Sequence, residues 1–187
     1  PFFEILCKQK IKFMKKNLLS LILIISTAFL CSSCKKDSAA AGNTASAANL
    51  AAGKCDIRFD YSGATSGSFA STLAISTAAS SGVLYNINGS AISGLIPQIT
   101  MIITPANTAV GTYAQSAAGA DLPNNMVFSF TSGSNGWASG GANAAGFKIV
   151  VTAVTSNTIE GTFSGEIGND TDLTKVTIAN GSFAAKF

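Results

Sequence analysis

The chain has 187 residues, of which only 11% are charged, and this length allows one domain of ordinary size with appendages. Because no residue is His, the chain lacks the commonest general base, the usual catalytic triads and the ligand of most catalytic zinc sites, so we expect a protein that is not an enzyme and holds no cofactor. Residues 34–187 carry seven positive and eight negative side chains, so no basic surface remains to neutralise phosphates and we expect no nucleic-acid partner.

The N-terminal region has the pattern of an export signal. From Met14 the sequence reads MKKNLLSLILIISTAFLCSSC, with two lysines, an apolar stretch and small residues before a cysteine, which predicts a signal peptide over 14–33. The apolar stretch of 13 residues is shorter than the roughly 20 that a membrane-spanning helix needs. Residues 1–13 precede this natural start, and we expect them to be absent from the mature protein.

The end of the leader resembles a bacterial lipoprotein signal. Small Ser32 and Ser33 precede Cys34, although Cys31 stands where such signals usually carry Leu. The resemblance implies cleavage before Cys34 and lipidation of its thiol, which would anchor the protein to the cell envelope, at the outer membrane in our expectation. Each buried acyl CH₂ contributes about 0.8 kcal/mol, so a multi-chain lipid holds a protein at a membrane. The alternative is an ordinary signal peptide with a chance cysteine.

A polar, uncharged segment follows the lipidated cysteine. Residues 38–53 read SAAAGNTASAANLAAG, with almost nothing large to bury, which predicts a flexible tether within 34–53 that leads to a domain over 54–187. Because Cys7 and Cys31 leave with the leader, Cys55 remains as a single cysteine in the domain. We expect it to be buried at the start of a strand.

From Lys54 onward the sequence has the period of β-strands. Apolar side chains first alternate with Asp56, Arg58 and Asp60, which we expect to form a solvated face. Similar runs between Gly, Ser, Asn and Pro clusters predict further strands over 68–76, 83–92, 98–104, 111–115, 126–131, 147–155, 158–167 and 174–187. Eight or nine short strands predict an all-β fold, an antiparallel β-sandwich, with a small closed β-barrel as the alternative.

Three segments carry more specific predictions. Residues 158–167 place their large apolar side chains on one face and Glu160 and Glu166 on the other, so the register of this strand is strongly specified. Residues 99–103 and 147–154 are apolar on both faces, which predicts central strands that are covered from both sides.

Three motifs in the second half of the chain resemble a known family. The motifs are ITMIITP with VGTY (99–105 and 110–113), IEGTFSG (159–165) and VTIANGSF (176–183). They resemble a family of small Bacteroidota lipoproteins of unknown function over residues 55–187, most closely over 95–187. The resemblance implies an exported, lipid-anchored all-β domain and assigns no catalytic residues. Within the last motif, Asn180-Gly181 suits a tight turn or a bulge.

One loop holds a candidate ligand-binding residue. Residues 131–146 are rich in Gly, Ser and Asn, which predicts a long surface loop, and they contain Trp137, the single tryptophan. An exposed loop Trp can stack on a sugar ring or anchor a protein partner. The competing interpretation is that Trp137 folds back as a lid on the end of the sandwich.

Carboxylates are the remaining candidates for chemistry. Asn169, Asp170 and Asp172 could supply oxygen ligands to a metal ion such as Ca²⁺, although a polar hairpin loop is the favoured interpretation. Glu160 and Glu166 are six residues apart, or about 20 Å along a strand. That exceeds the roughly 5–9.5 Å that separates paired glycosidase carboxylates.

These observations favour a lipid-anchored envelope protein whose domain is a non-catalytic binding or interaction module. Its partner would be a glycan or a surface protein, in addition to the membrane that holds the lipid. A polysaccharide hydrolase is the first alternative, because folding can bring together carboxylates that are distant in sequence. The second alternative is a structural or adhesive surface protein.

Overall fold

The structure is a computed structural model that describes residues 44–187 except 72, 74–75, 82–83, 93–94 and 105–107. The chain divides into two units, Pro1–Asp37 and Ser38–Phe187, and every described residue belongs to the second unit. The predicted signal peptide, Cys34 and the upstream segment 1–13 lie outside the described residues. No helix in the described part of the chain is long and apolar enough to cross a membrane.

The second unit is built from β-strands that all pair antiparallel. The strands are β1 (Lys54–Gly63), β2 (Gly67–Ala70), β3 (Thr77–Ser80), β4 (Tyr85–Ile92), β5 (Leu95–Ile103), β6 (Gly111–Ala114), β7 (Val127–Ser132), β8 (Asn135–Ala138), β9 (Lys148–Val154), β10 (Thr158–Gly168) and β11 (Lys175–Lys186). Short 3₁₀ turns lie at η1 (Ala47–Asn49) and η3 (Pro123–Asn125).

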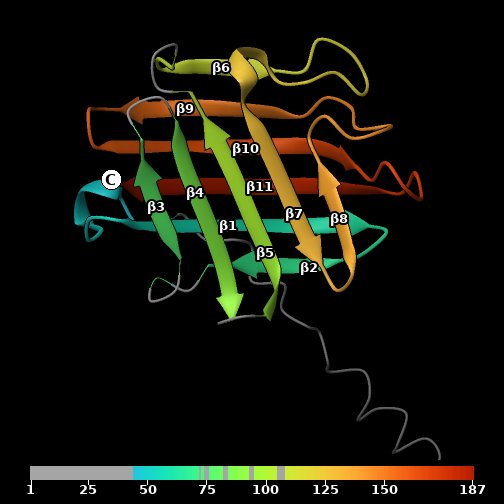
Figure 1. Ribbon diagram of the computed structural model, residues 1–187, viewed down its shortest axis with the longest axis horizontal. Coiled ribbons are helices and arrows are strands. Elements are labelled where there is room, and N and C mark those ends of the chain that lie inside the picture. The colour runs from blue at the N-terminus through green and yellow to red at the C-terminus, as the bar shows by residue number, and fades with distance from the viewer. Residues whose placement is uncertain (1–43, 72, 74–75, 82–83, 93–94, 105–107) are drawn as a thin grey trace, which may run out of the picture. The chain divides into compact units, whose positions relative to one another are not determined.

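The strands are arranged in two layers (Figure 1). The back sheet has the order β6-β9-β10-β11-β1-β2, and the front sheet has the order β8-β7-β5-β4-β3. One pair, Gly168 of β10 with Ala138 of β8, joins the layers into a curled sheet. The predicted antiparallel β-sandwich is confirmed. The end strands β2 and β3 do not pair through their described residues, so the sheet is open and not the closed barrel of the alternative.

A cluster of phenylalanine rings fills the space between the two layers. Phe59 of β1 lies 6.1 Å from Phe128 and 5.3 Å from Phe130 of β7, measured between ring centroids. Phe128 lies 4.9 Å from Phe163 of β10. All four side chains are buried, and full burial of one such side chain stabilises a fold by about 1.5–3 kcal/mol. The alternation of apolar residues along each strand thus produces one core.

Several strand predictions need correction. The expected strand 68–76 is a strand only at its start, in β2, whereas β3 begins at Thr77 and lies in the other layer. The expected loop 131–146 contains β8. The segments 99–103 and 147–154 are central in position but covered on one side only. Thr100 and Ile102 are half-buried and Thr152 is exposed, because no further layer lies outside either sheet in the described residues.

Strands β10 and β11 agree closely with the strands predicted over 158–167 and 174–187. Burial alternates along β10 with Ile159 and Phe163 in the core, as its pattern predicts. β11 is continuous, but its pairing with β1 and β10 shifts register between Ile178 and Ser182. Asn180 has a φ of 52° at this point. The Asn180-Gly181 pair is therefore a β-bulge within a long strand.

Candidate functional site

The segment that leads into the domain lies against the outer face of the back sheet. We call residues 44–50 the strap. Ala47 and Leu50 of the strap are buried together with Ala184, whose side chain points outward from β11. The predicted flexible tether over 38–53 is therefore wrong for its second half, because these residues dock on the sheet. Residues 38–43 lie outside the described part of the chain.

Two carboxylates hold the strap. Asp56 on β1 and Glu160 on β10 both pair in register with Ala184, so their α-carbons are two strand spacings apart, or about 10 Å. Asp56 Oδ2 accepts a hydrogen bond from the backbone N–H of Ala45 at 2.8 Å. Glu160 Oε1 accepts one from the backbone N–H of Ala47 at 2.5 Å and another from Ser46 Oγ at 2.9 Å. We call Asp56 and Glu160 the carboxylate pair.

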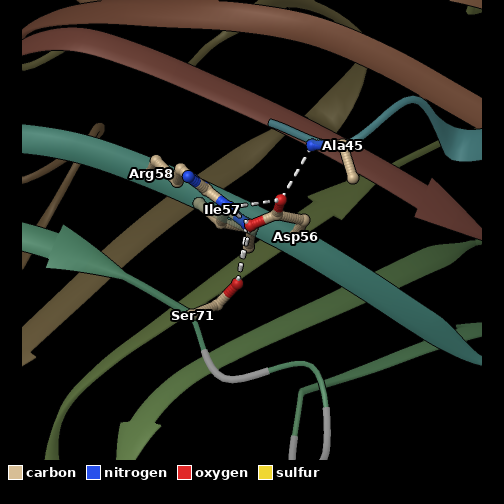
Figure 2. Close-up of polar contacts among 5 residues, drawn as sticks. All are labelled: Ala45, Asp56, Ile57, Arg58 and Ser71. Atoms are coloured by element: carbon tan, nitrogen blue, oxygen red, sulfur yellow. Dashed lines mark hydrogen bonds and ion pairs between the residues drawn. The ribbon is translucent and has the colours of Figure 1, made fainter. Parts of the chain in front are cut away.

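Asp56 is buried, contrary to the solvated face that its alternation predicts. Its side chain is 1% exposed, and it pairs with the half-exposed Arg58, whose Nε and Nη2 lie 3.2 Å from the two carboxylate oxygens. Ser71 Oγ lies 3.5 Å from Oδ1 and also accepts the N–H of Ile57 at 2.7 Å (Figure 2). A buried carboxylate is tolerated only with such partners.

The carboxylate pair does not form an open acidic site. The strap covers the space between the two acids. One oxygen of Asp56 accepts the N–H of Ala45, and one oxygen of Glu160 accepts the N–H of Ala47. The arrangement positions the incoming chain, and a sugar could not reach both acids while the strap is docked.

The candidate metal ligands are occupied by groups of their own turn and, for Asp170, by the neighbouring loop. Asn169 Oδ1 accepts the N–H groups of Thr171 and Asp172. Asp172 Oδ1 accepts both the N–H and the hydroxyl of Thr174, and these bonds lower the pKa of the Asp172 carboxyl. Asp170 Oδ1 accepts the N–H of Ala142 at 2.6 Å. These contacts favour the hairpin loop over a cation site, and no group of three His, Cys, Asp or Glu side chains gathers among the described residues.

Trp137 lies in β8 and is not part of a surface loop. Its side chain is 3% exposed and stacks on Phe130, with ring centroids 6.1 Å apart. Its Nε1–H donates to Thr174 Oγ1 at 3.0 Å. A ligand-binding role requires an accessible ring face, which this packing does not leave. The prediction of a loop was wrong because the Gly and Asn residues on both sides of Trp137 are typical of loops, although a four-residue strand contains it.

Cys55 is buried at the second position of β1, as expected. Its thiol donates to the carbonyl oxygen of Asn88 at 3.3 Å. Burial, followed by the neighbouring charge of Asp56, raises the pKa of the Cys55 thiol to about 12. The side chain is a protonated core residue at ordinary pH and not a nucleophile.

The charged residues of the domain are confined to the back sheet and to loops. Strands β3, β4, β5, β7 and β8, as the structure describes them, contain no Asp, Glu, Lys or Arg. The sequence signal is the absence of any charge between Asp60 and Asp121. This uncharged stretch was not identified as a surface from the sequence, because it forms a surface only once those strands pair in one layer.

The outer face of the front sheet, which we call the front face, is polar and uncharged. Figure 1 views the domain from the side of this face. Its half-buried or exposed side chains include Thr77, Ala79, Asn86, Asn88, Ser90, Gln98, Thr100, Ile102, Val127, Ser129, Thr131 and Ala138. Strand register places them in rows across the sheet, including Thr77–Asn88–Thr100–Ser129 and Ser90–Gln98–Thr131. The result is a broad surface of amides and hydroxyls.

No protein-family model matches the chain, and neither does any curated protein or solved structure. The resemblance to small Bacteroidota lipoproteins therefore stays a prediction that rests on the motifs in residues 95–187. The strap, the carboxylate pair and the front face are the features from which function can be argued.

Proposed function

We propose that the protein is a non-catalytic binding module that a lipid on Cys34 holds at the cell envelope, on the outer membrane, with its front face turned away from the bilayer. The observation that carries this proposal is the position of the strap. It lies on the outer face of the back sheet, where Asp56 and Glu160 bind its backbone. The chain therefore enters the domain on the side opposite the front face.

The length of chain before the strap limits how far the domain can lie from its proposed anchor. Nine residues separate Cys34 from Thr44, and nine residues span at most about 30 Å even when fully extended. A lipid attached at Cys34 would therefore keep the strap, where the chain enters the domain, within about 30 Å of the lipidated cysteine.

Binding is the role that the front face supports best. Four acidic side chains that a hydrolase could use are already engaged with the chain itself. Asp56 and Glu160 hold the strap, Asp170 accepts the N–H of Ala142, and Asp172 stabilises its own turn. The front face instead offers a wide, ordered set of hydrogen-bonding groups, which suits recognition.

The anchor is tested by intact mass and membrane fractionation of the chain expressed with its own leader in a related host. The wild-type protein is expected to carry a diacylglyceryl and an acyl group and to fractionate with the outer membrane. Cys34→Ala should lose this mass and enter the soluble fraction. Cys31→Ala is the matched control and should remain lipidated. A lipidated, membrane-bound Cys34→Ala variant would overturn the proposal.

A further inference from the structure

We infer that the front face binds a neutral polysaccharide that lies across the strands of the front sheet. This inference rests on the proposed binding role and names the ligand class for the same surface. A charged polymer is the wrong partner, because β3, β4, β5, β7 and β8 present no side chain of opposite charge. A neutral sugar polymer needs donors and acceptors without charge, and amides and hydroxyls provide both.

The rows give these groups a regular spacing. Neighbouring residues in a row are about 4.7–4.9 Å apart, which is close to the length of one sugar unit. A sugar chain that follows the row Thr77–Asn88–Thr100–Ser129 would therefore meet a new side chain at each unit. Each contact is weak, and the affinity arises from several rows acting on one polymer.

Part of this surface is already oriented for binding. Thr100 Oγ1 donates to Asn88 Oδ1 at 3.0 Å. This bond fixes the Asn88 side chain and leaves its NH₂ group to donate outward, with no acceptor for it among the described residues. A group that is held in place before binding loses less conformational entropy when the ligand arrives.

The front face carries a small aliphatic strip and, in its described residues, lacks the anchors on which protein interfaces centre. Ile102 and Val127 are neighbours in the row beside Asn86, and Val127 is 38% exposed. Such a small aliphatic strip can cover the C–H face of a sugar ring. Protein interfaces centre on aromatic, Met or Arg anchors, and the described outward side chains of the front face include none.

The test is a depletion-binding experiment with the purified full chain and insoluble cellulose, chitin and starch, with alginate beads as the anionic comparison. The test variant is Asn86→Lys/Thr131→Lys, which places two charges at exposed positions of the front face. The matched control is Thr162→Lys/Thr177→Lys, which adds the same charge at exposed positions of the back sheet. Thermal unfolding checks that both variants remain folded, and sedimentation velocity reports self-association.

The inference predicts that the wild-type chain binds at least one neutral polysaccharide and not alginate. Affinity should fall by about tenfold or more in the front-face variant and change by less than about twofold in the control. No binding to any neutral polysaccharide, or equal loss in both variants, overturns it. Self-association that only the front-face variant abolishes also overturns it, in favour of a second copy of the chain. Cys34→Ala should bind polysaccharide like wild type, so failure of the anchor and failure of the ligand assignment are distinguishable.

Discussion

Asp56 on β1 and Glu160 on β10 lie on either side of Ala184, and each accepts a backbone N–H from the strap. The two acids are 104 residues apart in the chain, yet they fix the same short segment. Because that segment leads into the domain, the carboxylate pair determines from which side the chain enters the domain. This relationship links the fold to the proposed orientation at the membrane.

Removal of the buried carboxylate should destabilise the domain. Asp56→Ala leaves Arg58 and the N–H of Ala45 without their acceptor, which should lower the free energy of unfolding by about 1–3 kcal/mol. Asp56→Asn keeps one acceptor oxygen and should cost less. Urea-induced unfolding measures both. Glu166→Gln is the control, because the exposed Glu166–Lys175 pair contributes at most about 1 kcal/mol. Equal effects of Asp56→Ala and Glu166→Gln would contradict the assignment.

Loss of the second carboxylate should free the strap without unfolding the sandwich. In Glu160→Ala the N–H of Ala47 loses its acceptor, so hydrogen exchange at Ala45 and Ala47 should accelerate while the core strands keep their protection. Exchange measured by mass spectrometry or NMR reports this difference. Unchanged exchange in the strap would show that the carboxylate pair does not hold it.

The Cys55 thiol should make stability depend on alkaline pH. Burial raises its folded-state pKa from an ordinary 9.0 to about 12, so the folded protein keeps a proton that the unfolded chain releases. The contribution is complete below pH 9 and is lost as the pH rises towards 12, on the order of 4 kcal/mol in total. Unfolding curves of wild type and Cys55→Ala between pH 8 and about 12 isolate the effect. Parallel curves for the two proteins would argue against a buried thiol.

Gly165 in β10 should tolerate no side chain. Gly165 has a φ of +126°, and a Cβ there would collide with the Cα of Phe147 and the carbonyl of Gly146. Gly165→Ala should cost about 2–5 kcal/mol, of which roughly 1–2 comes from the positive φ and about 1–3 from the clash. Gly133→Ala separates the two causes, because Gly133 has a φ of +63° and open space around it. Thermal melts that rank the two variants equally would contradict the packing at β10.

The sequence predicts the strands because each pattern is local. Alternation within 158–167 is sufficient to define both faces of β10, and Asn180-Gly181 indicates the bulge in β11. The strap could not be predicted, because an Ala- and Ser-rich segment binds only where distant residues present acceptors and a small Ala184 surface. The burial of Asp56 depends on the same contact, so its alternation with apolar neighbours pointed to solvent.

The uncharged front face also could not be predicted from local sequence patterns. Its lack of charge is visible in the sequence from 61 to 120, but a lack of charge indicates a surface only once strand order is known. Trp137 was prominent as the single tryptophan, whereas the core position that it occupies follows from the pairing of β8 with β7. The candidate site therefore emerged from tertiary pairing, and the strands themselves from local pattern.

The orientation of the domain on its anchor is the central claim, and fluorescence quenching by nitroxide-labelled lipid headgroups tests it most directly. The lipidated protein, with Cys55 replaced by Ala, would carry a fluorophore at Thr131→Cys on the front face or at Thr162→Cys on the back sheet, both exposed positions. Stronger quenching at position 162 than at position 131 is the predicted result. Equal quenching, or stronger quenching at position 131, would contradict the account.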